Sequence, residues 1–163
     1  MSLKSFIGHK LALLTVKREA KKAAQGVALQ QRVFERLIRH GAATRFGREH
    51  ELKGGMSHAE FCAAVPVRDY EKLKPWVDRA VAGERDVLWP GEPLYFCKTS
   101  GTTSGAKFIP ITRDSMPNHI NSARNALLHF IAHSGRPQFL DGKMIFLQGS
   151  PELAKTPGGT PMG

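Results

Sequence analysis

Apolar side chains recur every three or four residues in two stretches near the start of the chain. The first stripe is Leu3, Phe6, Ile7, Leu11 and Leu14, and the second is Val33, Phe34, Leu37 and Ile38. This spacing puts each set on one face of a helix. We therefore expect two helices, the second after Gly26, with Gly41 as the stop signal of the second.

The next stretch carries local signals rather than long stripes. Ala42–Gly55 is rich in glycine and charged residues and is expected to be a loop. Ser57 followed three residues later by Glu60 is a capping box, which predicts a short helix. Another helical stretch begins at Asp69, and Pro75 is expected in the first turn of a following helix.

A longer helix is expected over Ser115–His133, because apolar residues again follow helical spacing and Gly135 is a typical stop residue. Thr112 or Asp114 is expected to cap its start. The expected buried stripe of this helix is Ile120, Ala123, Leu127, Phe130 and Ile131.

Three apolar runs are of strand type: Leu94–Cys97, Phe108–Ile111 and Met144–Leu147. Pro110 cannot donate a main-chain hydrogen bond, so it should keep the second run at the edge of a sheet. The predicted fold class is α/β, with N-terminal helices beside a partial sheet. Because three strands are few for an independent sheet, we expect Gly163 to lie inside a longer protein. The alternative is a small protein with a disordered Gly/Pro-rich tail.

Composition narrows the class of protein. With 41% hydrophobic and 23% charged residues, the chain is typical of a soluble globular protein. We see no apolar run near the roughly 18 residues that span a membrane, and no signal peptide. The two cysteines lack CxxC spacing, which favours reduced thiols and a cytoplasmic location.

The net charge of +10 is uneven along the sequence. Residues 1–55 hold 12 Lys and Arg against 4 Asp and Glu, whereas residues 56–163 hold 12 against 10. One interpretation is a non-enzymatic basic module that binds nucleic acid or an acidic partner. No stacking aromatics or binding motif accompany the charge, so a solvated basic helical segment over 1–55 is preferred and nucleic acid is not the expected partner.

The segment Lys98–Lys107 has the composition of a phosphate-binding loop. Its glycines, Gly101 and Gly105, let main-chain N–H groups face an anion. The hydroxyl residues are Thr99, Ser100, Thr102, Thr103 and Ser104, and Lys107 adds a positive charge. The spacing is not that of a Walker A loop, which has four residues between its glycines and then Gly-Lys-Ser/Thr. A plain Ser/Thr/Gly hairpin between two strands is the alternative.

The run Ser100–Gly105 with Lys107 resembles the first signature of the adenylate-forming superfamily. The flanking segments resemble the Gretchen Hagen acyl-acid amido synthetases, also called the auxin-responsive promoter family. These segments are Pro66–Trp76, Gly83–Pro90, Lys107–Thr112 and Gly149–Glu152. The similarity runs from about Ala42 to the end of the chain.

The resemblance implies an ATP-dependent reaction in two steps. A carboxylic acid would attack the α-phosphorus of ATP to give an acyl-adenylate, and an amine or amino acid would then form the amide. Ser100, Thr102, Thr103 and Ser104 would donate hydroxyl hydrogen bonds, Gly101 and Gly105 main-chain ones, and Lys107 would be the catalytic charge clamp. A thioester-forming ligase of the same superfamily is the nearest alternative.

The resemblance also sets the expected domain organisation. Residues 1–163 would be the N-terminal part of a large adenylate-forming domain, with 1–55 basic and helical and 56–163 the α/β part. The rest of that domain and the C-terminal domain would be absent, so the isolated chain should be inactive. Mg²⁺ is implied as a cofactor, with its ligand in a later motif.

Overall fold

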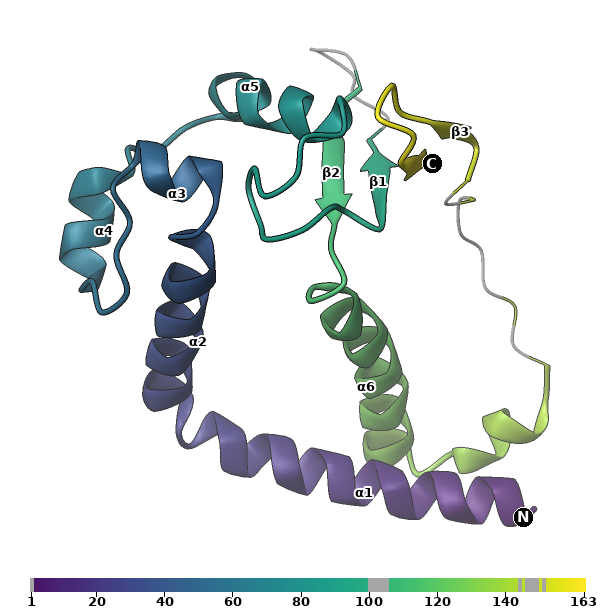
Figure 1. The fold of residues 1–163 in the computed structure, drawn as a ribbon. Helices are drawn as coiled ribbons and strands as arrows, with labels where there is room; N and C mark the ends of the chain where they lie inside the picture. Colours follow the sequence, from purple (N-terminus) through teal and green to yellow (C-terminus); the bar gives the residue numbers. More distant parts are fainter. Residues whose placement is uncertain (1, 100–105, 144, 146–149, 151) are drawn as a thin grey trace. The chain divides into compact units, whose positions relative to one another are not determined.

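The computed structural model describes residues 2–99, 106–143, 145, 150 and 152–163. Within this part the fold is mixed α/β, as expected, with six α-helices, one short 3-10 helix and a four-stranded sheet (Figure 1). The elements are α1 (Leu3–Ala23), α2 (Gly26–Gly41), α3 (Arg45–Glu49), α4 (His58–Ala64), α5 (Tyr70–Val81), β1 (Tyr95–Lys98), β2 (Phe108–Ile111), α6 (Met116–Ser134), η1 (Pro137–Asp141), β3 (Ala154–Lys155) and β4 (Pro161–Met162).

The chain forms two compact units. One comprises residues 1–29 and 114–148, and the other comprises residues 30–113 and 149–163. The expected organisation into segments 1–55 and 56–163 stays a prediction. No helix in the described ranges is both long enough and apolar enough to span a membrane.

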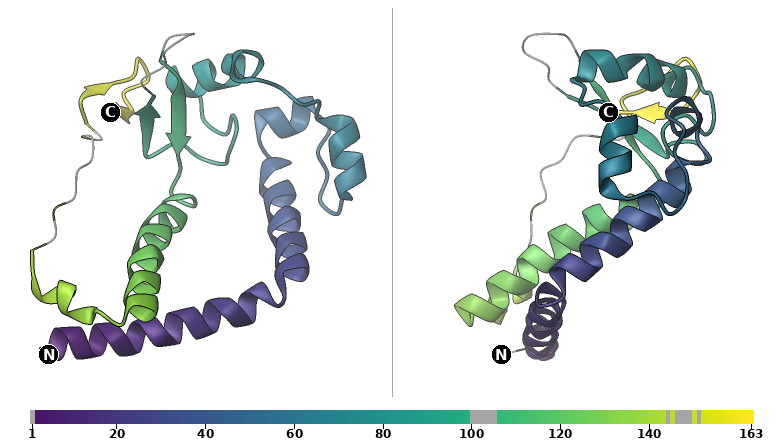
Figure 2. Two further views of the ribbon diagram at one scale, coloured as in Figure 1. Left: turned by 180° about the vertical axis from the view of Figure 1, so that it is seen from behind. Right: turned by 90° about the vertical axis from the view of Figure 1, so that its left-hand side faces the viewer.

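The first unit is built on the packing of α6 and η1 against α1 (Figure 2). Its buried core is Ala12, Leu128 and Ile131, with Phe139 and Leu140 packed beside it. The predicted stripe on α6 is largely wrong, because Ile120 and Phe130 are 60% and 52% exposed. The spacing of apolar residues shows which of them share a face of the helix, but it does not show which face packs against another element.

Most helix boundaries follow the local signals. The two N-terminal helices are confirmed, and α2 ends at Gly41. At α4, the Ser57 side chain accepts the Glu60 N–H while the Glu60 carboxylate accepts the Ser57 N–H, which confirms the capping box. The predicted long helix is α6, which ends at Gly135 in the left-handed conformation with φ of 65°. Ser115, not Thr112 or Asp114, occupies its N-cap position.

Two details of the helix prediction are wrong. Helix α3 lies inside the segment expected to be a loop, and Thr44 caps it by accepting the Gly47 N–H. Position 47 has no room for a side chain, because a Cβ on Gly47 would lie 2.0 Å from the Gly41 carbonyl oxygen. Pro75 does not begin a new helix, because α5 runs through it from Tyr70 to Val81.

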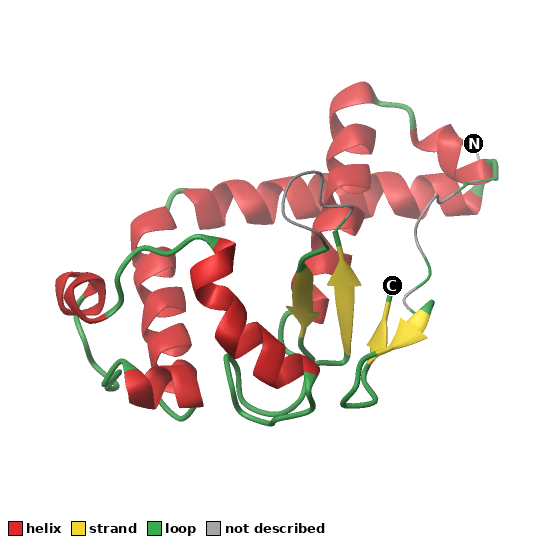
Figure 3. Cartoon of the chain, turned by 90° about the horizontal axis from the view of Figure 1, so that it is seen from above, coloured by secondary structure: helices red, strands yellow, loops and turns green. Residues whose placement is uncertain are grey.

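The sheet belongs to the second unit and has the strand order β2-β1-β4-β3. β1 pairs antiparallel with β2, with Phe96 opposite Pro110, so Pro110 lies on an edge strand as predicted. The Gly/Pro-rich tail contains no predicted strand. It instead forms a short hairpin of β3 and β4, and β4 pairs parallel with β1 (Figure 3).

The strand predicted at Met144–Leu147 falls mainly on positions outside the described residues. Of these four residues only Ile145 is described; it belongs to no strand and is 91% exposed. The remainder of that strand stays a prediction.

Candidate functional site

The predicted phosphate loop connects β1 to β2, two adjacent antiparallel strands. Both of its ends are described. The Thr99 N–H donates to the Lys107 carbonyl oxygen at 2.9 Å, and the Lys107 N–H donates to Thr99 Oγ1 at 3.2 Å. The residues between them that were predicted to bind phosphate, Ser100, Gly101, Thr102, Thr103, Ser104 and Gly105, lie outside the described residues. Of the predicted site residues, the structure therefore places Lys107.

A compact core fixes the strand that leads into the loop. Phe96 of β1 is fully buried and clusters with Ala80 of α5 and Val87, which is 1% exposed. On the β4 side, the Gly163 N–H donates to the Phe96 carbonyl oxygen at 3.1 Å, and the Lys98 N–H donates to the Gly163 carbonyl oxygen at 2.8 Å. The start of the loop is thus tied to the tail hairpin.

Helix α5 contacts the other end of the loop. The Phe108 N–H donates to the Tyr70 hydroxyl at 2.8 Å. The Lys107 ammonium lies over the Tyr70 ring, 5.4 Å from its centroid, within the range of a cation–π interaction. Within the described ranges, no carboxylate forms an ion pair with Lys98 or Lys107. Two cations therefore flank the loop, and neither has an acidic partner in the described part of the chain, an arrangement suited to an anion.

A polar and aromatic network joins α5 to α3. The Trp76 indole N–H donates to Glu49 Oε2 at 2.8 Å, and Arg79 contacts Glu84 through two nitrogens, at 2.6 and 3.0 Å. The Trp76 hydrogen bond lowers the pKa of the Glu49 carboxyl, and Arg45 adds to the effect. The Arg79 hydrogen bond likewise lowers the pKa of Glu84. Both carboxylates are thus favoured in the charged form.

The segment before α5 continues this network. Arg68 lies over the Trp76 ring at 5.3 Å and contacts His50 Nε2 at 2.8 Å. His50 stacks on Phe46 of α3 with ring centroids 4.1 Å apart. Phe46 also meets Trp76 edge to face at 5.2 Å. Helix α5 is consequently held along its length rather than at one point.

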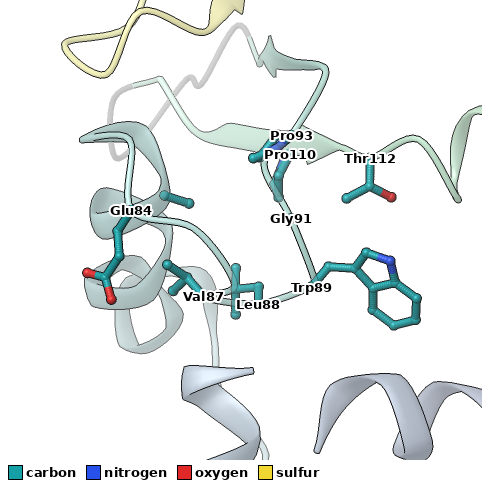
Figure 4. A pocket seen from close by; sticks show the side chains of 9 residues that line it. Glu84, Val87, Leu88, Trp89, Gly91, Pro93, Pro110 and Thr112 are labelled. Carbon is teal, nitrogen blue, oxygen red and sulfur yellow. The ribbon is translucent and has the colours of Figure 1, made fainter. Parts of the chain in front are cut away.

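A small cavity lies near Trp89, with Glu84 at one end and Trp89 at the other (Figure 4). Its volume is about 20 Å³, which is room for about one water molecule. The Trp89 ring stacks on His40, with centroids 5.4 Å apart. A cavity of this size is too small for an organic acid.

Two histidines of α6, His129 and His133, take part in polar contacts within the first unit. His129 contacts the Glu19 carboxylate, and His133 Nδ1 bonds to the His129 carbonyl oxygen at 2.9 Å. In the described part of the chain, no group of three or more His, Cys, Asp or Glu could hold a metal ion.

The loop is predicted from its sequence, but the contacts that hold its two ends are not. In the sequence, Tyr70 and Trp76 stand out only as part of the segment Pro66–Trp76 that resembles the family. Their hydrogen bonds link positions 38 and 27 residues apart. No local pattern marks such pairs, although the polar groups of Tyr and Trp side chains usually find a hydrogen-bond partner when they are buried.

Comparison with known proteins identifies a family. Residues 16–163 match the GH3 family N-terminal domain. The match begins earlier than the similarity noted from about Ala42. The chain is 29% identical over 136 residues to the probable indole-3-acetic acid-amido synthetase GH3.2 of Oryza sativa subsp. japonica, covering 82% of this chain and 22% of the relative.

Two further relatives are similar in the same way. The indole-3-acetic acid-amido synthetase GH3.5 of Arabidopsis thaliana is 27% identical over 139 residues, 82% of this chain and 22% of the relative. The putative indole-3-acetic acid-amido synthetase GH3.10 of Oryza sativa subsp. japonica is 30% identical over 137 residues, 81% of this chain and 28% of the relative. The chain thus spans about a quarter or less of the length of these relatives.

Proposed function

Because the chain belongs to the GH3 family, as its sequence led us to expect, we propose that it contributes the phosphate loop of an ATP-dependent acid–amine ligase. The relatives carry the name of amido synthetases. The proposed reaction activates a carboxylic acid as its acyl-adenylate and then transfers the acyl group to an amine or amino acid. In this proposal the remaining catalytic groups come from sequence beyond these 163 residues.

One observation supports this role above the others. The loop connects two hydrogen-bonded strands. Lys98 and Lys107 lie at its two ends, and neither has an acidic partner in the described structure. ATP supplies the triphosphate whose charge grows on the β- and γ-phosphates as pyrophosphate leaves. Lys107 would place a positive charge beside that growing charge, and main-chain and hydroxyl donors of residues 100–105 would complete the cradle.

The chemistry asked of these residues is positioning and electrostatic stabilisation rather than proton transfer. Lys107 is a charge clamp for the leaving group, so its contribution should grow towards the transition state. A contact that strengthens in this way raises the turnover rate more than it tightens substrate binding. Mg²⁺ would accompany the nucleotide, with protein ligands outside the described residues.

The test is exchange of labelled pyrophosphate into ATP by the full-length protein, with a panel of carboxylic acids. A charge-assisted contact to phosphate is worth about 1.5–3 kcal/mol. Lys107→Ala should therefore slow exchange by roughly 10- to 150-fold, with KM for ATP changed far less. Thermal stability should change little, because a partly exposed lysine contributes little packing.

Lys155→Ala is the matched control, because this exposed lysine lies on β3, which β1 and β4 separate from the strand that follows Lys107. It should leave the exchange rate unchanged. A Lys107→Ala protein that exchanges at the full rate would remove Lys107 from the phosphate site. Replacing the amine with coenzyme A separates the alternatives, since thioester product would identify the thioester-forming ligase.

A further inference from the structure

Tyr70 occupies a place in the fold that links helix α5 to the end of the loop. It is the first residue of α5, and Asp69 before it caps the helix by accepting the Lys72 N–H at 2.9 Å. The Tyr70 side chain is partly buried. Its hydroxyl and its ring face two consecutive residues, Phe108 and Lys107.

The Tyr70 hydroxyl accepts a main-chain N–H of β2 that no neighbouring strand can pair, because β2 lies at the edge of the sheet. Main-chain groups alternate in direction along a strand, and the Thr99 N–H bonds the Lys107 carbonyl inside the hairpin. The N–H of residue 108 and the position of residue 110 therefore face away from β1. Residue 110 is a proline and has no N–H to satisfy. The outward Phe108 N–H is the one that Tyr70 accepts.

The ring constrains the side chain of the neighbouring residue. Lys107 has a long flexible side chain that loses much rotamer freedom when it is ordered. The ring face of Tyr70 holds its ammonium 5.4 Å from the centroid. Contact of this kind narrows the volume that the ammonium samples, so less entropy is lost when a phosphate is gripped.

Tyr70 can do this only if α5 itself is fixed. The indole of Trp76 and the guanidinium of Arg79, one and a half to two and a half turns along the same helix, are hydrogen-bonded to Glu49 and Glu84. Val77 between them is 1% exposed. These contacts hold helix α5 in place, and with it the position of Tyr70.

We propose that Tyr70 is a positioning residue for Lys107, fixing the main chain after it through the hydroxyl and its ammonium through the ring. This inference rests on the proposed function of Lys107 in binding phosphate. It predicts that Tyr70 acts on the reaction through Lys107 alone, and that its two parts act separately.

Two substitutions separate the hydroxyl from the ring. Tyr70→Phe leaves the ring but removes the acceptor of the Phe108 N–H, and should lower kcat for pyrophosphate exchange by roughly 2- to 10-fold. Tyr70→Leu removes both and should lower kcat by roughly 5- to 50-fold. Tyr95→Phe is the matched control, since it removes the hydroxyl of the other tyrosine, on β1, and should keep the full rate.

A double-mutant cycle tests whether Tyr70 acts through Lys107. Tyr70→Leu added to Lys107→Ala should lower kcat no further, because the group that it positions is already gone. A double variant that instead shows the product of the two separate reductions in kcat would overturn the inference. So would a normal rate for Tyr70→Leu beside a slow Lys107→Ala, a result that leaves the proposed function standing. A normal Lys107→Ala rate would instead refute the proposed function itself.

A spectroscopic measurement without ATP reports the contact directly. With lysines reductively dimethylated by ¹³C-formaldehyde and a borohydride reductant, the Lys107 methyl signal is identified by its loss in Lys107→Ala. The Tyr70 ring current should shift this signal upfield in the wild type and in Tyr70→Phe, and the shift should vanish in Tyr70→Leu. An unshifted wild-type signal would overturn the positioning role whatever the kinetics show.

Discussion

The approach of Gly158 to Gly83 gives a sharp prediction about stability. Gly158 lies in the turn between β3 and β4, and its N–H donates to the Val81 carbonyl oxygen at the end of α5, at 3.1 Å. A Cβ on Gly158 would lie 2.4 Å from both the Cα and the N of Gly83 and 2.7 Å from the carbonyl carbon of Ala82. These are main-chain atoms, so no side-chain rotation can relieve the clash.

The size of the effect of Gly158→Ala follows from these distances. Carbon atoms pack at about 3.5–4.0 Å, so the two backbones must separate by about 1 Å or more. Overpacking costs about 1–3 kcal/mol, and the lost hydrogen bond adds about 1 kcal/mol. Alanine also restricts the unfolded chain more than glycine does, which stabilises the folded state by about 0.4–1 kcal/mol and offsets only part of this loss. We expect a net loss of about 2–3 kcal/mol and a Tm lower by roughly 5–12 °C.

The assay is thermal unfolding followed by circular dichroism, with Gly54→Ala as the matched control. A Cβ on Gly54 would meet nothing within 4 Å, so this variant should unfold near the wild-type temperature. Because β4 ends next to Gly163, loosening the hairpin should also speed hydrogen exchange at the Lys98 amide. Equal Tm values for Gly158→Ala and Gly54→Ala would refute the close approach of the tail hairpin to α5.

Three further predictions concern other parts of the chain. Folding lowers the pKa of Glu84 below its ordinary 4.5, so the stabilisation that its carboxylate provides is present above that pH and is lost as pH falls through the lowered pKa. The difference in Tm between wild type and Glu84→Gln, measured from about pH 7 to about pH 3, should therefore shrink below pH 4.5. A difference that stays constant over this range would contradict the prediction. Ser57→Ala removes the acceptor of the Glu60 N–H and should destabilise by about 1 kcal/mol in urea unfolding, a prediction refuted by an unchanged midpoint. The isolated 163 residues should show no carboxylate-dependent pyrophosphate exchange, and measurable exchange would show that they hold every essential group.

Local signals in the sequence predicted local structure well. Gly41, the Ser57–Glu60 pair and Gly135 each mark a helix end through atoms within a few residues, so no knowledge of the fold was needed. Pro110 indicated an edge strand because its missing N–H acts at its own position. Such features are encoded where they act.

Features that depend on distant neighbours were missed or misread. Gly47 read as a loop signal, but the glycine serves the close approach of α3 to the end of α2. Gly158 lies in a tail for which no structure was predicted, although its missing side chain allows the close approach of the main chain at Gly83. A glycine required for packing and a glycine in a flexible loop look alike in sequence. The two-residue strands β3 and β4 are also too short to show an alternating pattern.

The segments that resemble the family contact one another in the fold. Pro66–Trp76 reaches Lys107–Thr112 through the hydrogen bond of the Phe108 N–H to Tyr70. Gly83–Pro90 reaches α3 through the Arg45 N–H to Asp86 and the Phe46 N–H to Val87, at 2.7 and 3.0 Å. A hydroxyl- and glycine-rich hairpin has the same composition whether or not it binds phosphate. The Tyr70 contact holds the main chain at Phe108, and the rate of pyrophosphate exchange in Lys107→Ala is what separates the two possibilities.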